Sequence, residues 1–483
     1  MITLQTADLV RILPEIVLSI FGILVMVLEP FVAAAQKKLL GWMALLGVLA
    51  AATATVRTSF EPGLAFGGTI AADEFSIYFI YLFLLTAGLV ILGSIDYLER
   101  NHAQHGEFYA LVLLGTVGMC FMAASTDLIM IFLGLEISSI STYILAGFRR
   151  ADRLSNEAAL KYFLLGSFAT AFFLYGIAFV YGLTGTTNLL GLSARLMEPS
   201  QWTTFARVAL VLMFVGLAFK LSTVPFQVWT PDVYQGAPAP VTAFLSVGPK
   251  AAAFAVLLRL FLGGFASAGT VSFWILWISA ALTMCLGNLA ALWQTNVKRL
   301  LAYSSIAHAG YILVGVAAGG SRGISAVLFY LVAYALMNVG AFIMVAHLSG
   351  TGERLVQIED YTGLAFERPG VAACLAVFFL SLAGFPTTAG FLGKFYVFRA
   401  AIHSHLIGLT VLALLNSVVS VYYYLRIVVA MYMREGKTEA ATVELPWPVR
   451  TALAVSVLGI FYLGLAPKLP LGLSTLAALP LPK

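Results

Sequence analysis

Long apolar segments separated by short polar ones follow one another along almost the whole chain. A helix needs about 20 apolar residues to cross the hydrocarbon of a bilayer. Fourteen segments approach that length, near residues 9–33, 39–57, 75–95, 108–124, 126–148, 157–184, 204–228, 240–263, 270–294, 298–318, 322–348, 370–402, 405–433 and 449–468. Because lipid offers no hydrogen-bond partner to a free backbone group, each segment is expected to be a helix. The pattern therefore predicts an all-α polytopic membrane protein with about fourteen spans and both termini on one side.

Two of these segments are unusually long and hold a proline near the middle, Pro225 and Pro386. The prolines lie five spans apart, and an odd number of spans reverses the topology. Two inverted five-helix repeats, each with a Pro-broken helix, are therefore predicted; paired interrupted helices are typical of transport sites. Prolines also kink membrane helices without any function, and that alternative stays open. The expected organisation is a three-helix segment at 1–107, repeats at 108–265 and 266–433, and a last helix at 434–483.

The composition excludes soluble classes of protein. Hydrophobic residues make up 61% of the 483 residues and charged residues 10%, with a mean hydropathy of +0.96, whereas soluble domains carry about 25% charged residues. Cys120, Cys285 and Cys374 stand alone in apolar runs, and four of the six histidines fall in loops. Neither a zinc nor an iron–sulfur motif is found, nor a phosphate-binding glycine motif. No metal or cofactor is expected in this chain.

Loop charges predict how the chain is oriented. Lysine and arginine favour the loops that follow odd-numbered spans, namely Lys37, Lys38, Arg100, Arg149, Arg150, Arg153, Lys298, Arg299, Arg354, Arg368, Arg434, Lys437 and Arg450. Fewer lie in the other loops and at the termini. Since cytoplasmic loops are the ones enriched in lysine and arginine, both termini are predicted to lie outside, in the periplasm. No cleavable signal peptide is expected before the first span.

Five ionisable residues fall deep within the predicted spans: Glu136, Lys220, Lys250, His308 and Lys394. A charge at the bilayer centre costs roughly 2.5–3.5 kcal/mol on insertion scales, so such residues are seldom kept for packing alone. One interpretation is that they form ion pairs that hold helices together. The stronger interpretation, for one glutamate, three lysines and a histidine at similar depth, is a hydrated proton relay.

Glu136 and Lys220 are expected to act as a coupled pair. At a separation of about 7 Å and an effective dielectric of about 20, they would attract each other by about 2.4 kcal/mol. Moving them together or apart would then make Lys220 hold or release its proton. Lys250 and His308 would pass the proton along, and Lys394 would release it.

Polar side chains lie on the same helix faces as these residues. Ser139 and Tyr143 follow Glu136 at i+3 and i+7, and Ser304 and Tyr311 flank His308 at i−4 and i+3. Such stripes line water or join helices by hydrogen bonds, and spacing alone does not decide between the two. Tyr334 and Asn338 form a similar pair.

Other charged residues carry weaker expectations. Lys161 follows Glu157 by four residues, so a local ion pair is as plausible as a relay role. Asp232 is either a turn residue or a group at a channel mouth. Arg259 and Arg426 are expected to extend to lipid headgroups.

Three segments carry a resemblance to a known family: 132–139 (FLGLEISS), 219–238 (FKLSTVPFQVWTPDVYQGAP) and 296–308 (NVKRLLAYSSIAH). They resemble the antiporter-like membrane subunits of respiratory complex I, the proton-translocating NADH:quinone oxidoreductase, over essentially the whole chain. The resemblance implies fourteen helices in two inverted repeats. It also implies that Glu136 and Lys220 serve the first half-channel, Lys250 and His308 the connection, and Lys394 the second half-channel.

The resemblance further implies that this chain is a non-redox subunit of an enzyme assembly. NADH, flavin, iron–sulfur clusters and quinone would be bound by other subunits, and the partners would include the related antiporter-like membrane subunits. Among the family's three members, the largest has a lateral helix after the fourteenth span, and the middle-sized one has glutamate at the place of Lys394. This chain has Lys394 and is expected to have no such lateral helix, so it is most similar to the third member. The expected location is a bacterial inner membrane. The alternative is a subunit of a multi-subunit cation/proton antiporter without redox partners.

Overall fold

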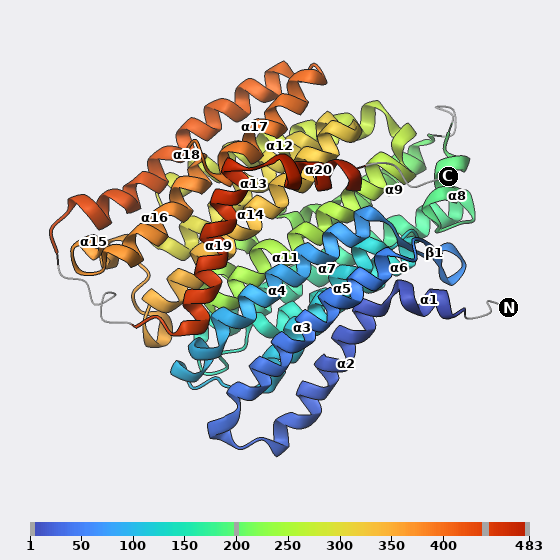
Figure 1. Cartoon of the computed structure of the whole chain (residues 1–483). Coiled ribbons are helices and arrows are strands. Elements are labelled where there is room, and N and C mark those ends of the chain that lie inside the picture. Colours follow the sequence, from blue (N-terminus) through green and yellow to red (C-terminus); the bar gives the residue numbers. More distant parts are fainter. Residues whose placement is uncertain (1–4, 198–201, 437–443, 479–483) are drawn as a thin grey trace.

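The computed structural model describes residues 5–197, 202–436 and 444–478 as a bundle of long helices (Figure 1). Within these ranges, thirteen helices are long and apolar enough to cross a membrane. They contain α2 (Leu13–Leu28), α3 (Lys38–Ser59), α4 (Glu74–Arg100), α5 (Gly106–Ala124), α6 (Leu128–Ala146), α7 (Arg153–Thr184), α9 (Thr204–Leu221), α11 (Ala239–Arg259), α12 (Thr270–Leu292), α13 (Val297–Ala318), α14 (Gly320–Leu348), α18 (Ile407–Met433) and α19 (Trp447–Leu465). The predicted all-α polytopic fold is confirmed.

Besides single turns of 3₁₀-helix and one π-helical turn at Leu260–Gly264, the described chain contains shorter α-helices and two strands. The helices are α1 (Thr6–Arg11), α8 (Leu189–Arg195), α10 (Trp229–Gly236), α15 (Leu364–Glu367), α16 (Pro369–Ala383), α17 (Ala389–His403) and α20 (Lys468–Ala477), and the strands are β1 (Gly63–Ala65) and β2 (Ile70–Ala72). The two strands pair antiparallel, with Leu64 opposite Ala71.

Both proline-containing segments are broken, as predicted. The first divides into α9 and α10 around Pro225, and the second into α16 and α17 around Pro386. Because α16 and α17 have 15 residues each, the twelfth predicted span is two half-helices, which accounts for thirteen long helices against fourteen predicted spans. Proline has no N–H to donate and clashes with the preceding turn, so it kinks or ends a helix.

The free carbonyl groups at the first break are satisfied locally. The indole Nε1 of Trp229 donates to the Phe219 carbonyl at 3.0 Å, and the backbone N–H of Thr223 donates to the Ala218 carbonyl at 2.9 Å. Thr283 of α12 accepts from the backbone N–H of Val224 at 3.0 Å. The break is therefore a fixed feature of the fold, held by a neighbouring helix.

Corresponding helices pack alike in the two halves. α5 packs on α6 as α12 does on α13, and α7 packs on both halves of the first broken helix, α9 and α10, as α14 does on both halves of the second, α16 and α17. The N-caps correspond too: Asp127 before α6 bridges antiparallel to Asn188, and Asn296 before α13 bridges antiparallel to Gln357.

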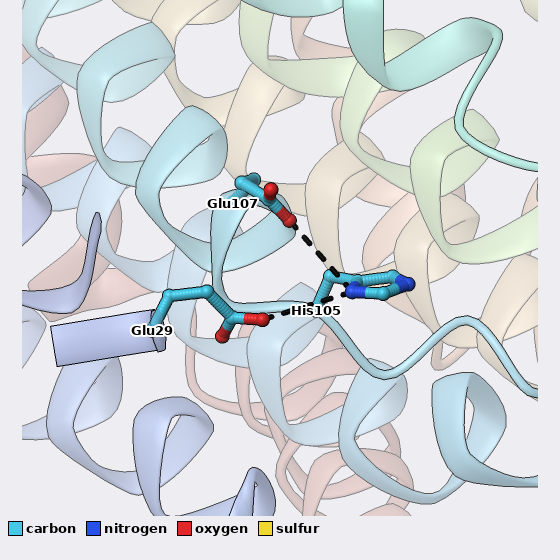
Figure 2. Close-up of side chains that lie close together, drawn as sticks. All are labelled: Glu29, His105 and Glu107. Atoms are coloured by element: carbon cyan, nitrogen blue, oxygen red, sulfur yellow. Dashed lines mark ion pairs between the residues drawn. The ribbon is translucent and has the colours of Figure 1, made fainter. Parts of the chain in front are cut away.

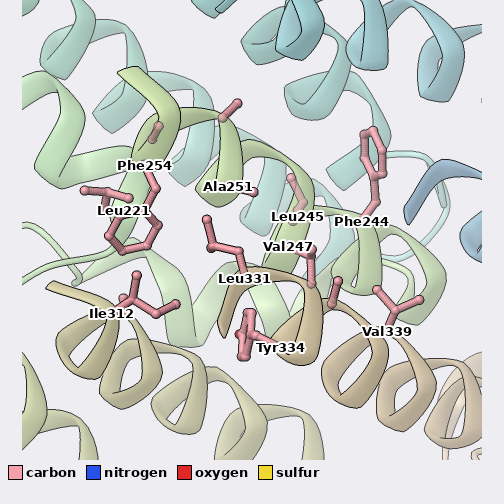
Figure 3. Packing of buried hydrophobic residues seen from close by; sticks show 14 of the residues in the cluster. Leu221, Phe244, Leu245, Val247, Ala251, Phe254, Ile312, Leu331, Tyr334 and Val339 are labelled. Atoms are coloured by element: carbon pink, nitrogen blue, oxygen red, sulfur yellow. The ribbon is translucent and has the colours of Figure 1, made fainter. Parts of the chain in front are cut away.

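The centre of the bundle is the contact between α11 and α14. The membrane-spanning window of α11 is fully buried, and Figure 3 shows Leu245 and Val247 of α11 near Leu331 and Val339 of α14. Alanine and glycine are frequent on α11, so the neighbouring backbones approach closely. A charged residue on α11 or on the α13 and α14 faces toward it is thus far from lipid.

The ends of the described chain lie on one side of the bundle (Figure 1). α1 packs on β1, and α20 contacts the beginnings of α4 and α14, with the Tyr78 hydroxyl 3.0 Å from Ser474 Oγ. The opposite side carries the loops at 101–105, 147–152, 293–296 and 349–357, and is called the loop face below. These loops follow odd-numbered predicted spans.

Candidate proton-transfer site

Four lysines of the described residues have no more than 4% of their surface exposed, and three of them, Lys220, Lys250 and Lys394, lie deep within the helices. Lys220 is in the last turn of α9, just before the first break. Its Nζ lies 3.5 Å from the Tyr162 hydroxyl and about 5 Å from the centroids of the Tyr143 and Tyr162 rings. The carbonyl end of a helix favours a positive charge, so α9 itself helps to hold this ammonium group.

Lys250, at the middle of α11, begins a hydrogen-bonded chain across three helices. Its Nζ donates to Ser305 Oγ of α13 at 2.5 Å. Tyr334 of α14 donates its hydroxyl to the same oxygen at 2.8 Å, and Asn338 Nδ2 donates to that hydroxyl at 3.0 Å. The ring of Tyr234 lies 5.5 Å from Lys250 Nζ on the other side.

His308 lies one turn beyond Ser305 on α13. Its Nδ1 is 2.9 Å from the Tyr330 hydroxyl and its Nε2 is 3.2 Å from the Tyr424 hydroxyl, so one nitrogen can accept a proton while the other donates. The Tyr334 ring is tilted toward the imidazole, with centroids 5.3 Å apart. The histidine is thereby placed next to the chain that starts at Lys250.

Lys394 lies on α17, just after the second break. Its Nζ donates to the carbonyl of Ala383, the last residue of α16, at 3.0 Å and to Ser417 Oγ at 3.0 Å. The ammonium group of Lys394 therefore sits at the carbonyl end of the first half-helix, as that of Lys220 does at the other break.

Glu136 of α6 is half-buried, and its Oε1 is buried without a hydrogen-bond partner among the described residues. No ion pair within 4.0 Å joins it to Lys220 in that part of the chain. The Tyr143 ring, one face of which meets Lys220, lies on the same helix two turns further on.

Lys161 and Asp232 form a cluster near the surface. Asp232 Oδ2 accepts from Lys161 Nζ at 2.7 Å and its Oδ1 from Arg299 Nη1 at 2.7 Å, and Lys161 also pairs with Glu157. Burial opposes the effect, but these two cations lower the pKa of Asp232 below its usual value. The local pair with Glu157 was one of the expected alternatives.

The expectation for Arg259 was wrong. Only 7% of its side chain is exposed, and it pairs with Asp73 at 2.8 Å and donates to the Ala123 carbonyl at 2.7 Å. Arg426 donates to the carbonyl groups of Leu292 and Gln294. Both guanidinium groups therefore cap helix ends instead of extending to lipid headgroups.

Sequence reasoning missed a buried ion pair and a buried acid. Lys298 Nζ lies 2.6 Å from Glu353 Oε2, and the two side chains are 1% and 3% exposed. Lys298 and Arg149 hold the pKa of Glu353 below its usual value although burial works in the opposite direction. The ion pair was missed because the sequence pattern places both of its residues in loops. The buried acid that was missed is Glu15 of the first span, and its signal in the sequence is a carboxylate within an apolar run.

One group of side chains has ligand types suited to a metal. Ligand atoms of Glu29, His105 and Glu107 lie within 4.8 Å of one another (Figure 2). The Glu29 carboxylate already pairs with Lys37 and accepts from the backbone N–H of Gly106 at 2.7 Å. Because Lys37 balances the charge of Glu29, this cluster is explained as an ion-pair network at the loop face.

Comparisons with known proteins agree with this architecture. The family model described as "NADH:quinone oxidoreductase/Mrp antiporter, TM" matches residues 125–420. The chain is 49% identical to NADH-quinone oxidoreductase subunit N 1 of Solibacter usitatus, over 98% of this chain and 97% of the relative. It is 46% identical to NADH-quinone oxidoreductase subunit N of Trichlorobacter lovleyi, over 96% of each chain.

Solved structures give the same result. A chain of respiratory complex I from Thermus thermophilus is 37% identical, with a TM-score of 0.81 and coverage of 96% of this chain and 99% of that one. A chain of the Mrp complex from Dietzia sp. DQ12-45-1b, at 23% identity and a TM-score of 0.84 over 97% of each chain, shares the fold. The chain therefore belongs to the family of NADH-quinone oxidoreductase subunit N.

Proposed function

We propose that this chain is a proton-translocating membrane subunit of an NADH:quinone oxidoreductase. Protons move through Glu136, Lys220, Lys250, His308 and Lys394, and electron transfer in other subunits drives them. The names of the relatives and the likeness to a chain of Thermus thermophilus respiratory complex I support the assembly. The arrangement of the buried side chains supports the roles of the residues.

The observation that carries the proposal is that the three lysines deep within the helices, unlike the buried Lys298, have only neutral partners. Among the described residues, no carboxylate oxygen lies within 4.0 Å of Nζ of Lys220, Lys250 or Lys394. If these lysines served to hold helices together, each would be expected to have a carboxylate partner. An ammonium group without a counter-ion is costly to bury, whereas the neutral amine is not, so each lysine can exchange a proton at modest cost.

Unsatisfied polar atoms between Lys220 and Lys250 support a hydrated path. Five buried side-chain oxygens in this region have no hydrogen-bond partner among the described residues, namely those of Tyr143, Ser222, Gln227 Oε1, Thr230 and Tyr234. Buried polar groups are rarely left unsatisfied, and ordered water is the usual partner where protein groups are lacking. Water at these oxygens would connect the two lysines past the stacked rings of Tyr162 and Trp229.

From Lys250 hydrogen bonds reach Ser305 and Tyr334. Water would complete the steps from there to His308 and from His308 to Lys394, where the contacts are ring contacts. The Tyr311 ring lies between His308 and Lys394. A histidine at this point suits a group that must take and give a proton near neutral pH. Glu136 modulates Lys220 by its charge and not by a direct ion pair.

The cellular setting is part of the same proposal. The two halves, 108–265 and 266–433, are inverted repeats, supported by the corresponding helix contacts and N-cap bridges. The subunit lies in a bacterial inner membrane with both termini in the periplasm. NADH, flavin, iron–sulfur clusters and quinone are bound by partner subunits, which include related antiporter-like chains.

A cation/proton antiporter subunit is the second candidate, because the Dietzia Mrp chain shares the fold. Purification in mild detergent separates the two. Co-purification of flavin and iron–sulfur subunits with NADH:quinone activity supports the oxidoreductase. Their absence from a complex that still contains this chain supports the antiporter.

The test of the relay uses the whole complex in proteoliposomes. Lys250→Met removes the titratable group at the centre of the path while keeping most of its volume. NADH-driven proton uptake should fall to a small fraction of that of the unaltered complex, at equal complex content on a native gel. Lys468→Met, at an exposed lysine of α20, is the matched control and should have no effect. Full proton uptake by the Lys250→Met complex would contradict the proposal.

A further inference from the structure

The loop face holds a polar cavity that leads to a buried ion pair. The cavity has a volume of about 640 Å³, and charged side chains line it, among them His102, His105, Arg149, Asp152, Lys298 and Glu353. His105 and its neighbour Glu107, which also lines the cavity, are drawn in Figure 2. Arg149 pairs with Asp152, while Lys298 and Glu353 lie at the inner limit of the cavity with almost no exposed surface.

The ion pair joins the beginnings of two helices of the proposed relay. Glu353 Oε1 accepts from the backbone N–H of Ala239, the first residue of α11, at 2.7 Å. Lys298, in the first turn of α13, donates to the Ala237 carbonyl at 2.7 Å as well as to Glu353. Lys250 lies 11 residues into α11 from Ala239, which is about 16 Å along the helix at 1.5 Å per residue.

Polar groups continue inward from the pair toward Lys250. Thr242 Oγ1 lies within 3.5 Å of the Ala237 carbonyl, to which Lys298 also donates, and it contacts the Tyr234 carbonyl at 3.2 Å. The Tyr234 ring faces Lys250. Its buried hydroxyl makes no hydrogen bond within 3.5 Å among the described residues, although Ser305, which accepts from Lys250, lies near enough to interact with it. Water at that hydroxyl would complete the path.

Stability alone is a weak reason to keep this pair. Removing two charges from water costs several kcal/mol each, and apolar residues of similar volume often serve as well or better. This pair is fully buried and lies between an open polar cavity and a buried lysine. A functional role therefore explains its presence better than a contribution to stability does.

We propose that Lys298 and Glu353 form the proton-entry site through which protons from the loop-face cavity reach Lys250. This inference rests on the proposed function and adds its entry point. A proton from water in the cavity binds the Glu353 carboxylate and makes it a neutral acid. Lys298, no longer held by a negative charge, passes one proton through water to the neutral amine of Lys250. The Glu353 proton then moves to the Lys298 amine and restores the ion pair, so one proton has moved inward.

The test is Lys298→Arg in the complete complex. Arginine keeps the positive charge and can pair with Glu353, but its guanidinium group does not release a proton in proteins. We expect the complex to assemble and NADH-driven proton uptake to fall to the level of a Lys250→Arg complex. Arg299→Lys, at the adjacent half-buried position, should retain full proton uptake.

A second variant covers the case in which arginine disturbs the buried site. In Lys298→Met/Glu353→Gln both charges are removed together, and the glutamine can still accept from Tyr97 and from the backbone N–H of Ala239. An assembled double variant with the same loss supports the entry site. Full proton uptake in either assembled variant overturns the inference. If Lys250→Arg is impaired in that case, the proposed function stands; if Lys250→Arg is also fully active, both fail.

Discussion

The ammonium group of Lys394 lies over the ring of Tyr311, 5.0 Å from its centroid. The same ring meets His308 edge-on, with centroids 5.8 Å apart, and its hydroxyl accepts from Asn288 Nδ2 at 3.0 Å. Tyr311 is thus in contact with both titratable groups at the Lys394 end of the path. Its ring stabilises the protonated lysine, and its hydroxyl belongs to a polar network with α12.

Substitution of Tyr311 should separate these two roles. Tyr311→Phe keeps the ring under Lys394 and loses only the hydroxyl, whereas Tyr311→Leu removes both. A desolvated cation–π contact is worth about 2 kcal/mol, so the leucine variant should lose most NADH-driven proton uptake and the phenylalanine variant should keep the larger part. Dye-quenching assays on proteoliposomes of equal complex content measure this. Equal loss in both variants would show that the hydroxyl, and not the ring, is what matters.

Glu136 should act through its charge. Because no ion pair within 4.0 Å joins it to Lys220 in the described structure, its influence is a longer-range attraction, which a shorter carboxylate preserves. Glu136→Gln and Lys220→Ala should each reduce proton uptake several-fold, and Glu136→Asp should be milder. The same proteoliposome assay applies. If the Glu136→Asp complex were as impaired as the Glu136→Gln complex, proton uptake would depend on the exact position of the carboxylate and not on its charge alone. If the Glu136→Gln complex were unimpaired, Glu136 would not belong to the path.

Asp232 should matter little to proton movement. It is one-third exposed and held by Lys161 and Arg299, and exposed pairs contribute about 0–1 kcal/mol each. We expect Asp232→Asn to keep most proton uptake and to lower the melting temperature of the complex slightly. Loss of proton uptake with normal assembly would instead place Asp232 in the relay.

The pH dependence of that stability effect follows from the direction of the shift. The folded-state pKa of Asp232 is below its usual value, so its contribution is present above that usual value and is lost only as pH falls through the lowered pKa. The difference in melting temperature between the unaltered complex and Asp232→Asn should therefore be constant from pH 8 to pH 5. A difference that shrinks between pH 8 and pH 6 would contradict the assignment.

The sequence was informative where a structural feature depends mainly on one residue and its place in its own segment. Proline favours a break within a long apolar run, and both predicted breaks lie at Pro225 and Pro386. Surroundings still matter, because α11 continues unbroken through Pro249. The deep position of Lys250 follows from counting residues along a helix, and the structure finds it buried. The serine, tyrosine and asparagine stripes also face the buried groups, as their spacing indicated.

Contacts between distant segments could not be read in this way. Lys298 and Glu353 are 55 residues apart, and each lies beside a turn, where a charged residue is unremarkable. Only the packing of the loop at 349–357 against the beginnings of α11 and α13 buries them. Arg259 and Asp73 are 186 residues apart and were missed for the same reason.

The second break also depends on a close approach that leaves no room for a side chain. A Cβ added at Gly390 of α17 would lie 1.8 Å from the backbone carbonyl oxygen of Ser381. The backbone N–H of Gly390 also donates to Ser381 Oγ at 3.2 Å, which fixes the two half-helices against each other. Since the obstacle is backbone, Gly390→Ala must shift α16 relative to α17 and with it the Ala383 carbonyl that holds Lys394.

We therefore expect Gly390→Ala to reduce assembly, by an effect on the order of the 1–3 kcal/mol that overpacking costs. The amount of complex on a native gel and its melting temperature measure this. Gly408→Ala is the control: Gly408 is helical in α18, no atom lies within 4 Å of an added Cβ, and alanine is the better helix former by about 1 kcal/mol. If the Gly390→Ala complex were as abundant and as stable as the control, the contact between the two half-helices would be looser than the structure describes, and the position of Lys394 would not depend on it.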